Sequence, residues 1–174
     1  MTIEIQRFSA DDIGAHKDEF IQLLRDVVDG GSSVNFIAPL DLEIAAAFWE
    51  RIAGEAAANT RIVVTALEAN RVVGCVHLVL AMQPNGRYRA EVQKVLVHSR
   101  ARRRGIATLL MRAIEDEARA VGRTVLVLDT EQGSGAEKLY EQIGYTRVGV
   151  FPQFALNSDG SAFISAVFFY KLLE

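Results

Sequence analysis

Arg102-Arg103-Arg104-Gly105-Ile106-Ala107 is the stretch of sequence that decides the fold. Upstream of it, residues 90–97 are rich in β-branched side chains and predict a strand. The turn leads into the start of a helix, where unpaired N–H groups and a partial positive charge are available. Because Gly105 and Ala107 have little or no side chain, a phosphate could approach this backbone closely. The stretch therefore predicts a site for a phosphate-like anion. The helix, starting at about Gly105, is predicted by the apolar residues Ile106, Leu109, Leu110, Ala113, Ile114 and Ala118.

Two familiar phosphate loops do not fit this turn. A P-loop needs Lys-Ser or Lys-Thr after a glycine, and the chain has neither pair. A dinucleotide fingerprint needs three glycines, and this turn has one. The turn instead matches Arg/Gln-x-x-Gly-x-Gly/Ala, the pyrophosphate-binding signature of the GNAT superfamily of N-acetyltransferases. Taken alone, the hexapeptide is also compatible with arginines that only face solvent.

A second signature follows the predicted helix. Residues 125–129 form an apolar run that ends in an aspartate and is typical of a buried strand. Residues 134–145 then resemble Ala-x-x-Leu-Tyr-Glu-x-x-Gly-Phe/Tyr, the second GNAT signature, at the usual distance from the first. Ser134 is a candidate N-cap and Gly144 a candidate C′ residue, which predicts a short helix. With both signatures in order, the chain resembles a GNAT N-acetyltransferase over nearly its whole length, most strongly over residues 88–150.

The tail resembles one subgroup of this superfamily. Residues 149–160 and 168–172 look like the corresponding segments of the tabtoxin-resistance acetyltransferases. They form two β-rich runs joined by the turn-forming Asn157-Ser158-Asp159-Gly160, which predicts a hairpin. This likeness does not identify the substrate.

Length and composition predict a single domain over residues 1–174. The formal charge of −3 argues against general nucleic-acid binding. One cysteine excludes an intrachain disulfide framework, and the sequence contains no apolar stretch of membrane-spanning length and no signal-peptide pattern. We expect a soluble, cytoplasmic protein with no nucleic-acid or membrane partner, and a homodimer is compatible with the fold.

The fold class expected is α/β, with a mixed sheet and the order β-α-α-β-β-β-α-β-α-β-β. This is the GNAT layout, which implies splayed strands with helices on both faces of the sheet. We expect a first helix capped by Asp11 or Asp12 and ending at about Val28, and a second helix that starts at Asp41. The strands expected before residue 90 are residues 3–8, 60–67 and 71–82.

The resemblance implies acetyl-CoA as the co-substrate, and no metal. In the family the pantetheine arm adds like a strand to the backbone that precedes the basic turn, because the neighbouring strand, here residues 124–129, splays away. A backbone N–H near Leu96 or Val97 would then polarise the thioester carbonyl. The cofactor-binding residues implied are Val95, Leu96, Val97, Arg102, Arg103, Arg104, Gly105, Ile106, Ala107, Thr108 and Ser134.

Acetyl transfer needs a base, because an alkylammonium has no lone pair with which to attack. Glu91 and Asp129 are the candidates, one on each strand of the splayed pair, and a partly buried cleft can raise the pKa of a carboxyl group. The subgroup resemblance implies that both act, directly or through water. The alternatives are that Glu91 only pairs with a neighbouring cation and that Asp129 only orders the Thr130-Glu131 turn.

Tyr140 is the candidate proton donor to the departing thiolate. In the family this helix tyrosine lies near the cofactor sulfur, and a buried tyrosine hydroxyl needs a partner. The alternative is a ring that only packs on the sheet.

Other residues have weaker assignments. Cys75 lies in an apolar strand and is expected in the core, while His77 and His98 lack metal-ligand spacing. Trp49 is also compatible with a purely structural role, because it falls at helical spacing. The candidate acceptor-binding residues are Phe36, Trp49 and Phe154.

The function predicted is acetyl-CoA-dependent N-acetylation, by direct attack, of the primary amine of an amino-acid-like or antibiotic- or toxin-like small molecule. One alternative is a catalytically silent CoA-binding module, and the complete set of Glu91, Asp129 and Tyr140 argues against it. A second alternative is acetylation of protein or peptide amines.

Overall fold

The computed structural model describes residues 2–174 and contains the predicted α/β elements. The helical segment expected after the first strand is divided in two at His16. In chain order the elements are β1 (Ile3–Phe8), α1 (Ala10–Ala15), α2 (Lys17–Asp29), α3 (Leu42–Ala57), β2 (Arg61–Glu68), β3 (Arg71–Leu80), β4 (Arg89–Val97), a 3₁₀ turn η1 (Ser99–Ala101), α4 (Ile106–Ala120), β5 (Val125–Glu131), α5 (Gly135–Gln142), β6 (Thr146–Leu156) and β7 (Phe163–Leu172).

The start of the first helix differs from the prediction. Ser9 is the N-cap, because its Oγ accepts from the Asp12 N–H at 3.1 Å and the Asp12 carboxylate accepts from the Ser9 N–H at 2.9 Å. Asp12 therefore completes a capping box from inside the first turn. The expectation that Asp11 or Asp12 caps this helix was wrong, since the reciprocal pair fixes the start ahead of both aspartates. Asp41 caps α3 as predicted.

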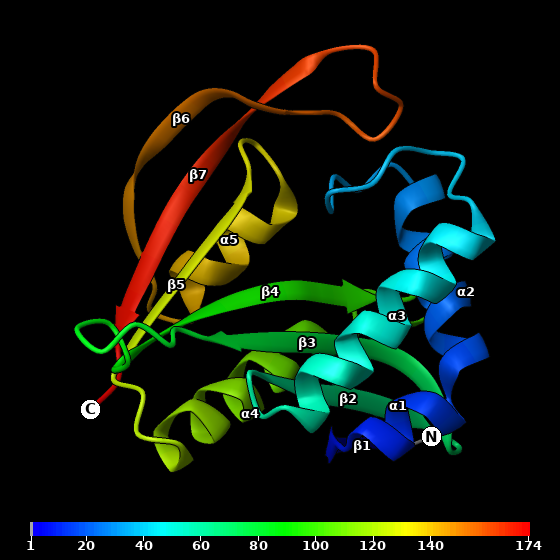
Figure 1. The fold of residues 1–174 in the computed structure, drawn as a ribbon. Helices are drawn as coiled ribbons and strands as arrows, with labels where there is room; N and C mark the ends of the chain where they lie inside the picture. Colours follow the sequence, from blue (N-terminus) through cyan, green and yellow to red (C-terminus); the bar gives the residue numbers. More distant parts are fainter. Residues whose placement is uncertain (1) are drawn as a thin grey trace.

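The described strands form one seven-stranded sheet in the order β1-β2-β3-β4-β5-β7-β6. Within residues 2–174, β4 and β5 are the one parallel pair, and their register covers Arg89↔Val125, Ala90↔Leu126 and Glu91↔Val127. Beyond Glu91 the two strands separate, and Figure 1 shows β5 diverging upward from β4. The predicted splay is confirmed, and it opens the middle of the sheet.

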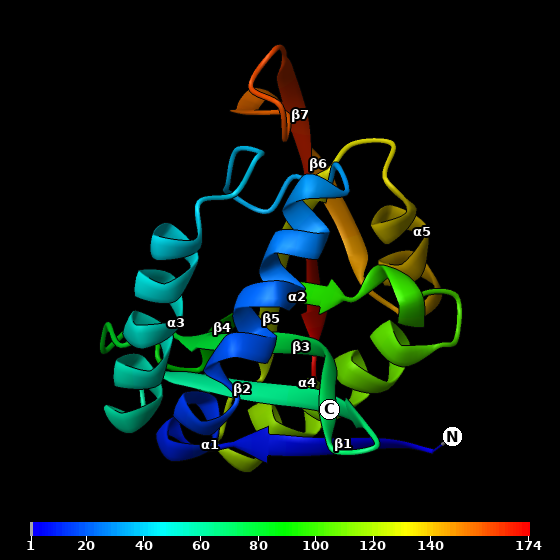
Figure 2. The same ribbon diagram turned by 90° about the vertical axis from the view of Figure 1, so that its right-hand side faces the viewer.

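Helices cover both faces of the sheet, each over its own apolar core (Figure 2). On one face α4 and α5 pack on the strands through side chains such as Leu110, Ile114 and Tyr140. On the other, α1, α2 and α3 bury Phe20 and Trp49, whose rings stack 4.3 Å apart. Two cores on a continuous sheet hold β4 rigid from both sides, while its separated edge stays accessible. In the part of the chain described, no helix has the length and apolarity needed to span a bilayer.

The predicted hairpin is formed by β6 and β7, joined through Asn157-Ser158-Asp159-Gly160. Between Phe151 and Ala155 the register shifts, so three residues of β6 face one of β7. This bulge contains Pro152, which has no N–H to offer a ladder. The irregularity bends the hairpin over the open part of the sheet (Figure 1).

Candidate active site

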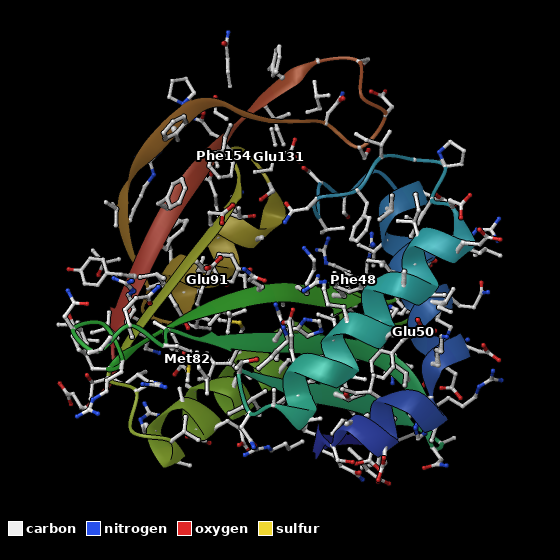
Figure 3. The ribbon with its side chains drawn as sticks, viewed as in Figure 1. Phe48, Glu50, Met82, Glu91, Glu131 and Phe154 are labelled. Carbon is white, nitrogen blue, oxygen red and sulfur yellow. The ribbon has the colours of Figure 1, made fainter. Side chains whose placement is uncertain are left out.

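A cleft of about 920 Å³ opens where β4 and β5 diverge. Its walls come from both strands, the first turn of α4, α5, the loop that precedes α3 and the β6–β7 hairpin. Figure 3 shows Glu91 beside the diverging strands, Phe154 projecting from the hairpin and Phe48 reaching from α3 toward β4. The two predicted signature segments therefore meet at one concave site.

One end of the cleft is the start of α4. Gly105 is the N-cap with φ +76°, and the first helical bond donated to it comes from the Leu109 N–H at 3.1 Å. Ile106, Ala107 and Thr108 precede that bond, and all three line the cleft. Their amides have no carbonyl of the helix to donate to, so this end of the cleft can bind an anion.

The three arginines before Gly105 point in different directions. Arg102 and Arg103 line the cleft, and Arg102 Nε donates to the Val97 carbonyl at 3.1 Å. Arg104 instead pairs with Glu68, Nη2 to Oε1 at 2.7 Å, and does not line the cleft. The sequence grouped all three as cofactor contacts, whereas Arg104 neutralises a carboxylate at the end of β2.

The basic turn is fastened to α2. The Asp26 carboxylate accepts from both the Ser99 N–H and the Ser99 hydroxyl, each at 2.7 Å, and lies 3.3 Å from His98 Nδ1. Burial acts to raise the pKa of Asp26, but the Ser99 hydrogen bonds and His98 outweigh it and lower the pKa. These contacts attach the basic turn to α2 on the side away from the cleft. His98 contacts Asp26 there and does not line the cleft.

A β-bulge shapes the cleft side of β4. Cys75 pairs with Leu96 and His77 with Gln93, so Lys94 and Val95 together face a single residue of β3. Lys94 adopts φ +53°, a left-handed conformation that costs a non-glycine residue about 1 kcal/mol. Residues held in this conformation cluster at active sites and ligand-binding segments.

The edge of β4 beyond the bulge is the backbone segment that was expected to bind the pantetheine arm. Its side chains alternate between the cleft and the opposite core. The side chains of Val95 and Val97 line the cleft. That of Leu96 is fully buried in the opposite core, so only its backbone can take part in the predicted contact. Within the described chain the β5 pairing has ended by this point, which leaves the edge open to an added strand-like ligand.

The two candidate bases face the same space. Glu91 pairs with Val127, two residues before Asp129 on the adjacent strand, and both carboxylates line the cleft. The Gln93 amide donates to Glu91 Oε1 at 2.8 Å, while its own carbonyl oxygen accepts from Arg61 Nη1 at 3.3 Å. Glu91 is therefore oriented by a side-chain relay that begins at a buried arginine.

Asp129 lies in the cleft with a raised pKa. The cleft walls strip part of its hydration, and Glu91 adds a like charge, so its pKa is raised although Lys94 acts to lower it. A carboxylate whose pKa lies above the ordinary range is better suited to take up and release a proton near neutral pH.

Tyr140 lies on α5 with 5% of its surface exposed and lines the cleft. Its ring centroid is 5.9 Å from those of Tyr145 and Phe169. Burial, and then the charge of Asp129, raise the pKa of its hydroxyl well above the ordinary value. The hydroxyl is therefore protonated at neutral pH. The predicted packing of the ring and an active hydroxyl are compatible with one another.

The hairpin and the loop before α3 close the far side of the cleft. The Ala38 N–H donates to the Ser158 carbonyl at 2.6 Å, which ties the loop to the hairpin turn. The bulge of β6 directs Phe154 into the cleft, where its ring meets Phe168 edge-on at 5.4 Å. Phe154 thus lines the cleft, as the sequence suggested.

The other two acceptor candidates do not line it. Trp49 is fully buried and stacked on Phe20. Phe36 is half-buried and packs edge-on against Phe48 at 5.3 Å, while its neighbour Ile37 is 47% exposed. Both aromatic side chains support the cleft wall from behind.

Cys75 is fully buried, as expected, and His77 is fully buried beside it. Burial raises the pKa of the Cys75 thiol and lowers that of His77 well below its ordinary value, with Arg61 and Lys94 adding to the second effect. Neither is suited to nucleophilic or metal chemistry, and residues 2–174 contain no cluster of His, Cys, Asp and Glu that could hold a metal ion.

Sequence reasoning missed Gln93 and Lys94, although both belong to the strand that it singled out. Glu91 and Gln93 follow the alternation of a half-buried strand, and a further polar residue at position 94 breaks it. Two consecutive polar residues in such a strand are a signal for a bulge, because a regular pleat would turn one of them into the core.

Comparison with solved structures places this fold among acetyltransferases. An N-acetyltransferase from Staphylococcus aureus Mu50 matches with a TM-score of 0.81 at 19% identity, over 100% of both chains. The yncA protein of Salmonella typhimurium, solved with its cofactor acetyl-CoA, matches with a TM-score of 0.77 at 20% identity, over 100% of this chain and 95% of the other. A ribosomal-protein-alanine N-acetyltransferase from Brucella melitensis matches with a TM-score of 0.75 at 23% identity, over 98% and 99%.

The family comparison agrees with the geometry. The model of the acetyltransferase (GNAT) family matches residues 33–145, which contain β4, the basic turn, α4, β5 and α5. This match covers more than half of the chain and includes both predicted signatures. The chain therefore belongs to the GNAT family of acetyltransferases.

Proposed function

We propose that this protein transfers the acetyl group of acetyl-CoA to the primary amine of a small molecule, by direct attack of the amine. The observation that carries the proposal is the end of the β4–β5 pairing at Glu91. It creates one cleft in which an anion-binding helix start, an open strand edge and two carboxylates face each other.

The cleft fits the two polar parts of acetyl-CoA. The amides of Ile106, Ala107 and Thr108, with Arg102 and Arg103, would hold the diphosphate. The amide-bearing arm would lie along the open edge of β4 at residues 95–97, as an added strand does. When bound there, acetyl-CoA supplies an acetyl group that is already activated as a thioester.

Glu91 and Asp129 would remove the proton of the acceptor ammonium. Gln93 holds the Glu91 carboxylate in place, and the raised pKa of Asp129 favours proton uptake near neutrality. The likeness of residues 149–160 and 168–172 to the tabtoxin-resistance acetyltransferases supports a role for both acids. Tyr140 would supply a proton to the departing sulfur from its buried, neutral hydroxyl.

A small acceptor is favoured over a polypeptide by the bridge between Ala38 and Ser158. This contact joins the loop before α3 to the hairpin turn, and the joined segments would hinder the passage of an extended chain on that side of the cleft. Neighbours of the same fold act on different acceptors, since one is an aminoglycoside 6′-acetyltransferase and another acetylates ribosomal-protein alanine. The acceptor must therefore be inferred from the cleft and not from the fold.

The test is calorimetric titration of acetyl-CoA and of CoA into the purified protein, followed by thiol release in the presence of a panel of primary amines and short peptides. We expect saturable binding of both, and thiol release that depends on a small amine, with the acetylated product identified by mass spectrometry.

Absence of acetyl-CoA binding would overturn the proposal. Binding without thiol release on any amine would favour a silent CoA-binding module. Release with peptides but not with small amines would move the acceptor to a protein, and the Ala38–Ser158 bridge would then have to open.

A further inference from the structure

Lys94 is a cation of the cleft to which the proposed acetyl-transfer chemistry gives no role. It lies in the β4 bulge, three residues after Glu91, and lines the cleft together with Glu91 and Asp129. Its strained backbone places a polar side chain where a regular strand would place an apolar one.

The Lys94 ammonium has aromatic neighbours but no paired anion. Its Nζ lies 5.8 Å from the ring centroid of Phe36 and 5.9 Å from that of Phe48. Among residues 2–174, no carboxylate oxygen lies within 4.0 Å of it, whereas both nearby arginines, Arg51 and Arg61, pair with Glu55. Figure 3 shows Phe48 directed toward β4 from α3, on the side of the cleft away from the hairpin.

This arrangement is costly without a partner. Burial lowers the pKa of Lys94 to about 8, with Arg61 contributing, while Asp129 at longer range acts in the opposite direction. At neutral pH the ammonium is still largely charged. A half-buried charge with two aromatic faces and no bonded anion is the arrangement expected of a binding subsite that an anionic ligand completes.

We propose that Lys94 binds an anionic group of the acceptor, so that the acceptor is an amine that also carries a carboxylate, as an amino acid does. This inference rests on the proposed function, since it takes the acceptor amine to approach Glu91 and Asp129. The acceptor then bridges the cleft, with its ammonium on the two acids and its carboxylate on Lys94, whose ammonium lies near the rings of Phe36 and Phe48.

A different role for Lys94 gives a different outcome. If Lys94 served only as the countercharge of Asp129, its removal would impair every acceptor equally, because the base itself would change. If it binds the acceptor, its removal impairs acceptors that carry the carboxylate and spares those that lack it.

The experiment compares matched pairs of amines that differ only in the carboxylate: L-lysine with cadaverine, L-ornithine with putrescine, and L-phenylalanine with phenethylamine. Each is assayed by thiol release with the wild type, Lys94→Met and Lys94→Arg. Lys17→Met is the matched control, since Lys17 lies on α2 and pairs with Glu50 away from the cleft. Circular dichroism and thermal unfolding check that each variant is folded.

We expect the wild type to prefer the carboxylate member of at least one pair. Lys94→Met should raise KM for that member by roughly 10- to 100-fold, in line with the loss of a hydrogen bond to a charged group. Its partner should show only the smaller change that both members share through the effect of Lys94 on the pKa of Asp129. Lys94→Arg should restore part of the preference, and Lys17→Met should behave as the wild type.

A second readout does not depend on turnover. The protein has four lysines, at positions 17, 94, 138 and 171, so the ε-carbon signal of Lys94 in ¹³C-lysine-labelled protein can be assigned from its loss in Lys94→Met. In the presence of CoA, the carboxylate members of the pairs should shift this signal saturably, and the members without a carboxylate should not.

Equal losses of kcat/KM for both members of a pair, no effect of Lys94→Met, or no carboxylate-dependent shift of the Lys94 signal would each overturn the inference. A wild type that acetylates only amines without a carboxylate would overturn it too, while leaving the proposed function intact. Failure of acetyl-CoA to bind would instead reject the proposed function, and the inference that rests on it would fall as well.

Discussion

Gln93 holds Glu91 by a hydrogen bond of 2.8 Å from its side-chain amide, and Arg61 in turn donates to the Gln93 carbonyl oxygen at 3.3 Å. Arg61 is itself fixed by Glu55, Nε to Oε2 at 2.5 Å. A chain of polar contacts therefore runs from the end of α3 to the candidate base. It makes the orientation of Glu91 depend on residues that never reach the acceptor.

Gln93→Leu tests this dependence. The substitution removes both hydrogen bonds at similar volume, so Glu91 loses its fixed orientation, and we expect kcat/KM for the acceptor to fall roughly 10-fold through misalignment. Acetyl-CoA affinity by calorimetry should stay unchanged. Gln132→Leu, on an exposed turn outside the cleft, is the control. A full wild-type rate in Gln93→Leu would remove the relay from the mechanism.

Asp129→Asn addresses which acid is the base. The pKa of Asp129 is raised by lost hydration and by Glu91. As the pH falls, its carboxylate should therefore become protonated at a higher pH than an ordinary aspartate does. The acid limb of the wild-type kcat/KM profile should lie in that raised range, and Asp129→Asn should flatten it. Glu91→Gln is measured alongside. A profile that changes only in Glu91→Gln would assign the base to Glu91 alone.

The same raised pKa predicts a stability effect of known sign. A carboxyl group whose folded-state pKa exceeds its unfolded value stabilises the fold at low pH, and this stabilisation is lost as pH rises through the folded-state pKa. Asp129→Asn removes the penalty of the ionised group, so we expect its melting temperature to exceed that of the wild type at pH 7. The difference should shrink toward pH 3.5, and a difference independent of pH would contradict the shift.

Gly105 separates backbone strain from charge at the start of α4. An added Cβ meets no atom within 4 Å, but φ is +76°, so Gly105→Ala and Gly105→Glu share a strain of about 1 kcal/mol. Both should lower the melting temperature by roughly 2–4 °C. Calorimetry should show that only Gly105→Glu abolishes acetyl-CoA binding, because its carboxylate would face the diphosphate. Loss of binding in both variants would mean that helix geometry, and not charge, decides.

The fold could be read from the sequence because its deciding features are local. The strand–turn–helix around Gly105, the helix between Ser134 and Gly144, and the hairpin turn at 157–160 each depend on neighbouring residues. The first helix was misjudged for a related reason. Aspartate is a favourable N-cap residue, so Asp11 and Asp12 were reasonable candidates. The reciprocal hydrogen bonds between Ser9 and Asp12 show that Ser9 is the N-cap.

The acceptor side of the cleft depends on long-range packing, which residue types alone do not encode. Trp49 and Phe36 are aromatic residues on the wall nearest the site, yet the stacking of Trp49 on Phe20 and the edge-on packing of Phe36 against Phe48 turn both inward. Lys94 faces the cleft because of a bulge set by the register with β3. The direction of a side chain at an irregular strand position follows from that pairing, which a single sequence does not show.

Tyr140→Phe tests the proton donor, and Tyr145→Phe is its built-in control. The two rings lie 5.9 Å apart in the same core, but only Tyr140 lines the cleft. Because burial keeps the Tyr140 hydroxyl protonated, its loss should lower kcat by roughly 100-fold, the scale of one general-acid contribution. The acetyl-CoA dissociation constant should be nearly unchanged in both variants.

Two further comparisons make this prediction specific to proton donation. A general acid matters most when the leaving group is a poor one, so thioesters of more acidic thiols should reduce the defect of Tyr140→Phe. Tyr145→Phe should retain the wild-type kcat with every thioester, since Tyr145 does not line the cleft. Equal defects in the two variants would mean that both rings act only through packing, and weaker acetyl-CoA binding at constant kcat would make Tyr140 a binding residue.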